Sequence, residues 1–296
     1  MLWIAATLSA AAAQTARNAM QSSLTERLGT LGATQVRFVF GFPFACLFLA
    51  GILLATGGTI PSSNARFLGF TGTGAVAQIL GTVFLLAAMR ERSFSVATAF
   101  TKTEAVQVAL FGLVILGDEL TPVRMLAIAI ATAGLFFIAF KPGQKLNAES
   151  VRPALYGVAS GGMYAIAAVG FRGGILALDD GVYFLRASTT LVWSLGIQSV
   201  LLGGWMMAFQ RSALKASFGV WRQSLFAGFM GALASQFWFV GFSLTTAANV
   251  RTLGLIEVLF AQAVSRRLFS QQTSPRELGG MALVVGGVGL LLAAAV

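Results

Sequence analysis

Residues 104–139 of this chain read EAVQVALFGLVILGDELTPVRMLAIAIATAGLFFIA, and residues 257–292 repeat the pattern as EVLFAQAVSRRLFSQQTSPRELGGMALVVGGVGLLL. In each copy an apolar run headed by one glutamate ends, and a hydroxyl residue followed by proline opens the next run. Proline loses no hydrogen bond in the first turn of a helix, so it favours a helix start at that point. A shift of 153 positions aligns four residues of the two copies: Glu104 with Glu257, Thr121 with Ser274, Pro122 with Pro275 and Gly134 with Gly287.

The composition is that of a membrane protein. The 296 residues are 57% hydrophobic and 10% charged, and their mean hydropathy is +0.82, which exceeds what a soluble core could hide. A membrane-spanning helix needs about 20 mostly apolar residues. The alternating pattern of a membrane barrel is absent. We therefore expect an all-α integral membrane protein with ten transmembrane helices, at 2–20, 33–55, 67–88, 94–116, 122–140, 154–176, 183–207, 223–244, 247–269 and 278–296.

The repeat divides the chain into halves. We expect a first five-helix repeat over residues 1–140, a connecting loop over 141–153 and a second five-helix repeat over 154–296. Five is an odd number, so the second repeat enters the membrane from the opposite side and the two are inverted. Inverted repeats are a frequent architecture of secondary transporters, whose binding sites lie near the bilayer midplane. A duplication kept only for packing is the alternative, and it predicts that the buried charges are all paired.

These motifs resemble those of a known family. A glutamate in the fourth span, GDELTP at residues 117–122 and the glycine-bearing segment that follows, repeated in the second half, resemble the drug/metabolite transporter superfamily, and in particular its EamA branch. The chain departs from the usual pattern in that Ala105 and Val258, rather than proline, follow the glutamates. The resemblance implies a ten-helix tandem EamA repeat that exports amino acids, other metabolites or drugs, often against a proton gradient. More distant relatives exchange sugar phosphates or nucleotide sugars.

The cations outside the spans predict the orientation in the membrane. Twelve of the 20 Lys and Arg residues lie in or beside odd-numbered joints, whereas only Arg66 and Arg124 lie in or beside even-numbered ones. The positive-inside rule then places the odd joints in the cytoplasm and both termini outside. The family resemblance instead implies termini inside, and the sequence leaves this choice open. The expected location is the cytoplasmic membrane.

Apart from the arginines already counted with the joints, eight charged residues fall inside the predicted spans, and a charge at a helix centre costs roughly 2.5 kcal/mol or more. Six are cations and two are Glu104 and Glu257, so such residues are expected to face a wet or paired interior. Lys102 and Glu104 are two positions apart and point to different helix faces, so their partners are expected on other helices. Either glutamate could carry a coupling proton or form a static ion pair. The six cations are Arg17, Arg37, Lys102, Arg172, Arg186 and Arg251.

Uncharged polar residues within the spans add weaker candidates. Gln78 and Gln236 lie at roughly corresponding places in spans three and eight, where each amide either holds helices together or binds substrate. Trp238 lies in span eight. The chain has no histidine and a single cysteine, so it indicates no histidine-based or zinc site and no cofactor. The basic residues are already explained by membrane topology, so nucleic acid is not an expected partner.

Taken together, these features predict a secondary transporter and not an enzyme. We expect a substrate or coupling-ion site built from Glu104, Glu257, Lys102, Arg37, Arg186, Gln78, Gln236 and Trp238. The substrate would be an amino acid or a similar small metabolite, exported by alternating access with protons as the coupling ion. The excess of interior cations equally permits an antiporter of phosphorylated or other anionic metabolites. The expected partners are the lipid bilayer, the small-molecule substrate and protons, and the two halves in one chain favour a monomer.

Overall fold

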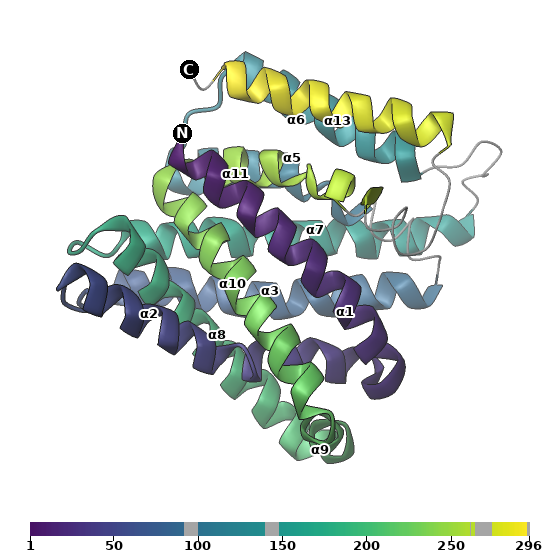
Figure 1. Ribbon diagram of the computed structural model, residues 1–296. Coiled ribbons are helices and arrows are strands. Elements are labelled where there is room, and N and C mark those ends of the chain that lie inside the picture. Colours follow the sequence, from purple (N-terminus) through teal and green to yellow (C-terminus); the bar gives the residue numbers. More distant parts are fainter. Residues whose placement is uncertain (92–99, 140–147, 261, 264–273, 295–296) are drawn as a thin grey trace. The chain divides into compact units, whose positions relative to one another are not determined.

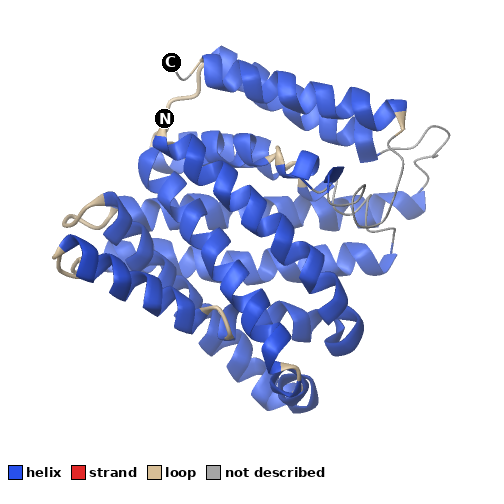
Figure 2. Ribbon diagram, viewed as in Figure 1, coloured by secondary structure: helices blue, strands red, loops and turns tan. Residues whose placement is uncertain are grey.

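The computed structural model describes residues 1–91, 100–139, 148–260, 262–263 and 274–294. Within these ranges the chain is helical with short loops and holds no strand (Figure 2). The all-α prediction is therefore confirmed. Six of the described helices are long and apolar enough to cross a membrane, and they lie at Leu31–Thr56, Ala65–Ala88, Arg152–Leu176, Tyr183–Phe209, Trp221–Leu244 and Pro275–Ala293. Glu104–Leu116 and Pro122–Ile138 are shorter apolar helices.

The helices group into two compact units, each built from both halves of the sequence (Figure 1). Unit 1 comprises Met1–Ile79 and Gly170–Thr245, and unit 2 comprises Leu80–Val169 and Thr246–Val296. The units thus do not coincide with the two sequence repeats, because the long helices α3 (Ala65–Glu91) and α7 (Ala148–Leu176) each contribute residues to both units. α7 also begins six residues before the predicted span, inside the expected connecting loop.

Unit 1 is organised around α1 (Leu2–Val39), which packs along α10 (Trp221–Leu244). Gly29, with φ of 67°, bends α1 between its first and second spans. A positive φ of this kind is strained for residues with a Cβ, so glycine suits the bend. α8 (Tyr183–Phe209) packs against α10 and against α2 (Phe42–Thr56), and a short helix, α9 (Arg211–Gly219), joins α8 to α10.

Unit 2 holds the repeated stretch. The first copy forms α5 (Glu104–Phe111), a π-helical turn (Gly112–Leu116) and α6 (Pro122–Ala139). Gly117, at φ of 69°, ends the first helix. The second copy continues from α11 (Ala247–Gly254) and ends in α13 (Pro275–Ala293). α6 lies against α13, which is its equivalent in the second repeat, and α5 lies against α11 (Figure 1).

The hydroxyl–proline pairs start helices in both repeats, as the sequence pattern predicts. Ser274 caps α13 with a full capping box, in which its hydroxyl accepts a bond from Glu277 N at 3.2 Å and Glu277 Oε2 accepts from Ser274 N at 2.7 Å. Thr121 Oγ1 accepts a bond from Arg124 N at 3.3 Å. The equivalent of Glu277 is Arg124, so the first repeat lacks the carboxylate half of the box.

We expect Ser274→Ala to lower the free energy of unfolding by about 1 kcal/mol, because it removes a side-chain acceptor from the first turn of α13. Thr121→Ala should have a smaller effect, since its capping bond is longer and has no reciprocal partner. Reversible unfolding of the purified protein in detergent, followed by circular dichroism, measures both values. Equal losses in the two variants would contradict this account of the capping box.

Candidate functional site: a crossed pair of ion pairs

The helices that carry the two glutamates are interrupted at equivalent positions. Helical structure gives way to a turn at residues 102–103 in the first repeat and at residues 255–256 in the second. A shift of 153 positions superposes the two turns. In each case the helix resumes at the glutamate, which therefore occupies the first residue of a new helical segment. An acidic residue is favoured there by the helix dipole.

The backbone bonding at the two breaks is the same. In the first repeat the amides of Thr103, Ala105 and Val106 donate to carbonyls three residues earlier, at 3.2, 3.4 and 3.1 Å. In the second repeat the equivalent amides of Ile256, Val258 and Leu259 do the same, at 3.1, 3.2 and 2.9 Å. Such three-residue bonds tighten a helix, and inside a longer helix they often mark a functional hinge.

The break in the first repeat is held by α7 of the same unit. A Cβ added at Gly161 would lie 2.7 Å from Thr101 O, so only glycine lets α7 approach the break this closely. Gln107 Nε2 donates to Thr103 Oγ1 at 2.9 Å and to Val158 O at 3.2 Å. The side chain of Gln107 thus ties the first turn after the break to α7.

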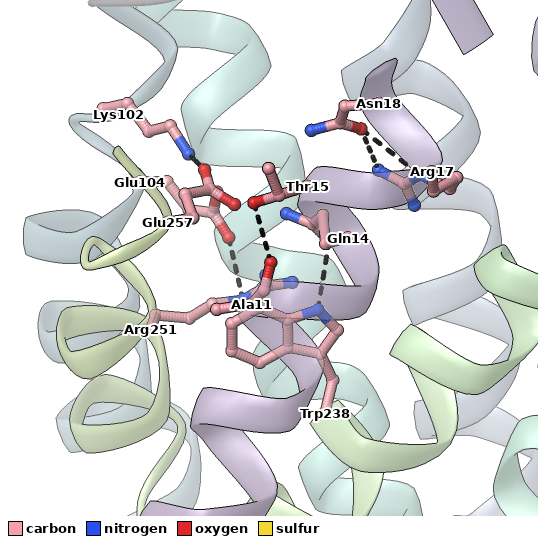
Figure 3. Close-up of polar contacts among 10 residues, drawn as sticks. All are labelled: Ala11, Gln14, Thr15, Arg17, Asn18, Lys102, Glu104, Trp238, Arg251 and Glu257. Atoms are coloured by element: carbon pink, nitrogen blue, oxygen red, sulfur yellow. Dashed lines mark hydrogen bonds and ion pairs between the residues drawn. The ribbon is translucent and has the colours of Figure 1, made fainter. Parts of the chain in front are cut away.

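Each glutamate forms an ion pair with a cation of the other repeat (Figure 3). Lys102 Nζ of the first repeat bonds Glu257 Oε1 of the second. Arg251 Nε of the second repeat lies 3.0 Å from Glu104 Oε1 of the first. The exposed fractions of these side chains are 25% for Lys102, 15% for Glu257, 16% for Arg251 and 14% for Glu104.

The four charges sum to zero and lie on neighbouring helices of unit 2. Lys102 and Glu104 do not bond each other, which agrees with their two-residue spacing. Low exposure makes each pair interdependent, because removing one partner leaves a charge with little solvent around it. The crossed ion pairs, meaning Lys102–Glu257 and Arg251–Glu104, therefore link the two repeats at their helix breaks.

The remaining interior cations lie in unit 1, in different surroundings. Arg172 Nη1 donates to Phe242 O at 2.7 Å and to Thr245 O, so it caps the C-terminal end of α10. Arg17 is 8% exposed and bonds Asn18 Oδ1 through Nη2 at 2.7 Å. Arg17 and Arg172 therefore differ in the groups that they bond.

Arg17 and Arg37 approach the same point on α10. A Cβ added at Gly231 would lie 3.5 Å from Arg17 Cδ and 3.4 Å from Arg37 Cγ, so both side chains pass over this glycine. The Arg37 guanidinium also lies 5.4 Å from the centre of the Phe38 ring. Two arginine side chains of α1 thus meet at one point of α10, and we call them the Gly231 arginine pair.

The predicted uncharged residues bond other helices of unit 1. Trp238 Nε1 donates to Gln14 Oε1 at 3.0 Å (Figure 3). Gln78 Oε1 accepts a bond from Gln198 Nε2 at 2.7 Å, and Gln236 Nε2 donates to Ser188 Oγ at 2.8 Å. Bonds of this kind hold transmembrane helices together.

The eight predicted site residues are divided between the two units. Glu104, Glu257 and Lys102 come together in unit 2, where Arg251 joins them. Arg37, Arg186, Gln78, Gln236 and Trp238 belong to unit 1. Arg186 is half-buried on α8, and its buried Nε has no hydrogen-bond partner among the residues that the structure describes. The site predicted from the sequence did not include Arg251, Arg17 or Gln14, although all three are polar residues within predicted apolar spans.

Comparison with known proteins identifies a similar family and structures of similar fold. Residues 1–140 match the model of the EamA-like transporter family. No curated protein matches the sequence. Among solved structures, 29 chains match. One, described only as the crystal structure of a protein, has a TM-score of 0.73 and 16% sequence identity, covering 99% of this chain and 95% of the other. At that identity the likeness shows the fold alone, and it extends over both halves of the chain.

Proposed function

We propose that this chain, whose residues 1–140 match the EamA-like transporter family, is an EamA-type member of the drug/metabolite transporter superfamily that exports amino acids or similar small metabolites, with protons as the coupling ion. The family match and the apolar helices support a multi-pass membrane protein that transports small molecules. The direction of transport, the substrate class, the proton and the cytoplasmic membrane are the proposal.

The crossed ion pairs are the observation that carries the proposal. A transporter that works by alternating access needs an element that both repeats share and that can take two arrangements. Each glutamate lies directly after a helix break and forms an ion pair with a cation of the other repeat. A movement of either repeat therefore changes the ion pair of a glutamate in the other repeat. A proton bound to Glu104 or Glu257 would neutralise that carboxylate and release its cationic partner. In this way proton binding would favour one of the two arrangements of the transporter.

The Gly231 arginine pair supports the hypothesis that the substrate carries an anionic group. Arginine suits carboxylate and phosphate because its planar guanidinium group donates two parallel bonds. Within the predicted spans, and leaving aside the arginines counted with the joints, the cations exceed the carboxylates by four. The crossed ion pairs use equal numbers of each, so the excess lies in unit 1. This excess supports the amino acid and also a second candidate, an antiporter of phosphorylated metabolites.

Transport by the purified protein in liposomes tests the proposal. We expect accumulation of a radiolabelled amino acid when a pH gradient is imposed, and collapse of that accumulation when a protonophore removes the gradient. Liposomes without protein serve as the control. Exchange of phosphate esters that ignores the pH gradient would favour the antiporter instead. Failure of amino acids, organic acids and phosphate esters alike to move would overturn both candidates.

A further inference from the structure

α9 is a nine-residue helix set between two membrane spans of unit 1. At about 1.5 Å per residue it is far too short to cross a bilayer. Gln210 and Val220 interrupt the helical backbone on either side of it, so α8, α9 and α10 follow one another with a change of direction at each junction. α9 packs against α1, α8 and α10 of the same unit.

The segment from α9 to the start of α10 is basic. Arg211, Lys215 and Arg222 are all exposed. No Asp or Glu occurs in the sequence between Asp180 and Glu257, so this part of the chain supplies no carboxylate of its own to the three cations. Arg211 Nε donates to Met207 O at 2.6 Å, and the Arg222 guanidinium lies 5.4 Å from the centre of the Trp221 ring.

Exposed aromatic side chains flank the same cations. Trp205, Phe209, Phe218 and Trp221 are 43%, 74%, 53% and 52% exposed. Phe218 also packs against Phe40, the residue that follows α1, with ring centres 5.0 Å apart and ring planes tilted by 45°, which fixes α9 against the unit. Tryptophan is enriched where hydrocarbon meets headgroups. A short helix that combines cations with large apolar side chains is the pattern of a segment lying in the membrane interface.

We infer that α9 and its two flanking turns bind the phosphate groups of anionic phospholipids. We call residues 205–222 the α9 surface. Its aromatic side chains enter the acyl region of the bilayer, and Arg211, Lys215 and Arg222 contact the lipid headgroups. The charge count over the whole chain predicts that this joint lies on the cytoplasmic side, where the surface potential of the leaflet is negative. The inference does not depend on the proposed function, because it concerns no residue of the crossed ion pairs or of the Gly231 arginine pair.

Energy transfer from tryptophan to dansyl-labelled lipid tests the inference. The full-length protein in phosphatidylcholine nanodiscs is titrated with dansyl-phosphatidylglycerol or dansyl-phosphatidylcholine, without any transport substrate. We expect a clear preference for the anionic lipid. Lys215→Gln should weaken that preference about fivefold, since a surface cation near anionic lipid contributes roughly 1 kcal/mol. Lys215→Gln combined with Arg222→Gln should weaken it further.

Arg66→Gln is the matched control. Arg66 is exposed and lies 5.7 Å from the Phe70 ring, much as Arg222 lies beside Trp221, but it belongs to a joint of the opposite parity. Arg66→Gln should leave the lipid preference unchanged. An equal loss in Arg66→Gln would overturn the inference, because the preference would then reflect overall charge. An unchanged preference in the double variant would also overturn the inference. It would likewise be overturned if the surface bound polyglutamate, a soluble polyanion, in place of the anionic lipid.

Discussion

Replacing Glu104 by glutamine is expected to abolish transport and to lower the free energy of unfolding by about 3 kcal/mol. The amide fills the same space, but it leaves Arg251 without its countercharge in a site where only 16% of that side chain is exposed. Losing one partner of a buried ion pair typically costs about 3–5 kcal/mol, and the remaining exposure places Glu104 at the lower end. Arg251→Gln should cost a similar amount.

The double variant Glu104→Gln with Arg251→Gln separates stability from transport. With both charges gone, most of the lost stability should return, and the difference from additivity measures the coupling between the two residues. Transport should not return, because the proposed proton site is gone. Lys102→Gln and Glu257→Gln provide the same cycle for the other ion pair. Unfolding in detergent and uptake into liposomes measure the two properties on the same preparations.

Glu119→Gln is the control for these variants. Glu119 is exposed and lies in the loop before α6, so the same chemical change there should alter stability by less than about 0.5 kcal/mol. Normal amino acid uptake and an unchanged pH dependence in both Glu104→Gln and Glu257→Gln would refute the coupling role. A loss of stability with normal transport would leave the crossed ion pairs as a purely structural link.

The sequence predicts most of the fold because its signals are local. The hydroxyl–proline pairs place the starts of α6 and α13 at or within three residues of the predicted spans. The exclusion of a Lys102–Glu104 bond follows from helix geometry alone. By contrast, the break at residues 102–103 carries neither glycine nor proline, so the run around it resembles a continuous helix.

The pairing of charges could not be predicted, because it depends on which helices become neighbours. Lys102 and Arg251 occupy different positions relative to their own glutamates, two and six residues before them, so the repeat pattern gives no hint that they play matching roles. Only the contact between α5 and α11 brings each cation to the other repeat. The predicted spans 183–207 and 223–244 place α9 in the joint between them, where no helix was predicted from the sequence.

Gly287→Ala is expected to destabilise the protein, whereas the adjacent change Gly286→Ala is expected to stabilise it slightly. A Cβ at Gly287 would lie 2.6 Å from Ala131 N and 2.7 Å from Ala127 O of α6, and these backbone atoms cannot move aside as a side chain would. A Cβ at Gly286 would meet no atom within 4 Å. Overpacking of this kind costs about 1–3 kcal/mol, while alanine improves helix propensity over glycine by up to about 1 kcal/mol.

The same comparison tests the symmetry of the two repeats. Gly134 is the equivalent of Gly287, and a Cβ there would lie 2.6 Å from Gly280 O and 2.9 Å from Val284 N of α13. Gly134→Ala should therefore lose about as much stability as Gly287→Ala in detergent unfolding. A loss in Gly286→Ala as large as in Gly287→Ala would contradict the close contact of α6 and α13. A loss confined to one repeat would show that the two helices do not contact each other equivalently, even though their sequences repeat.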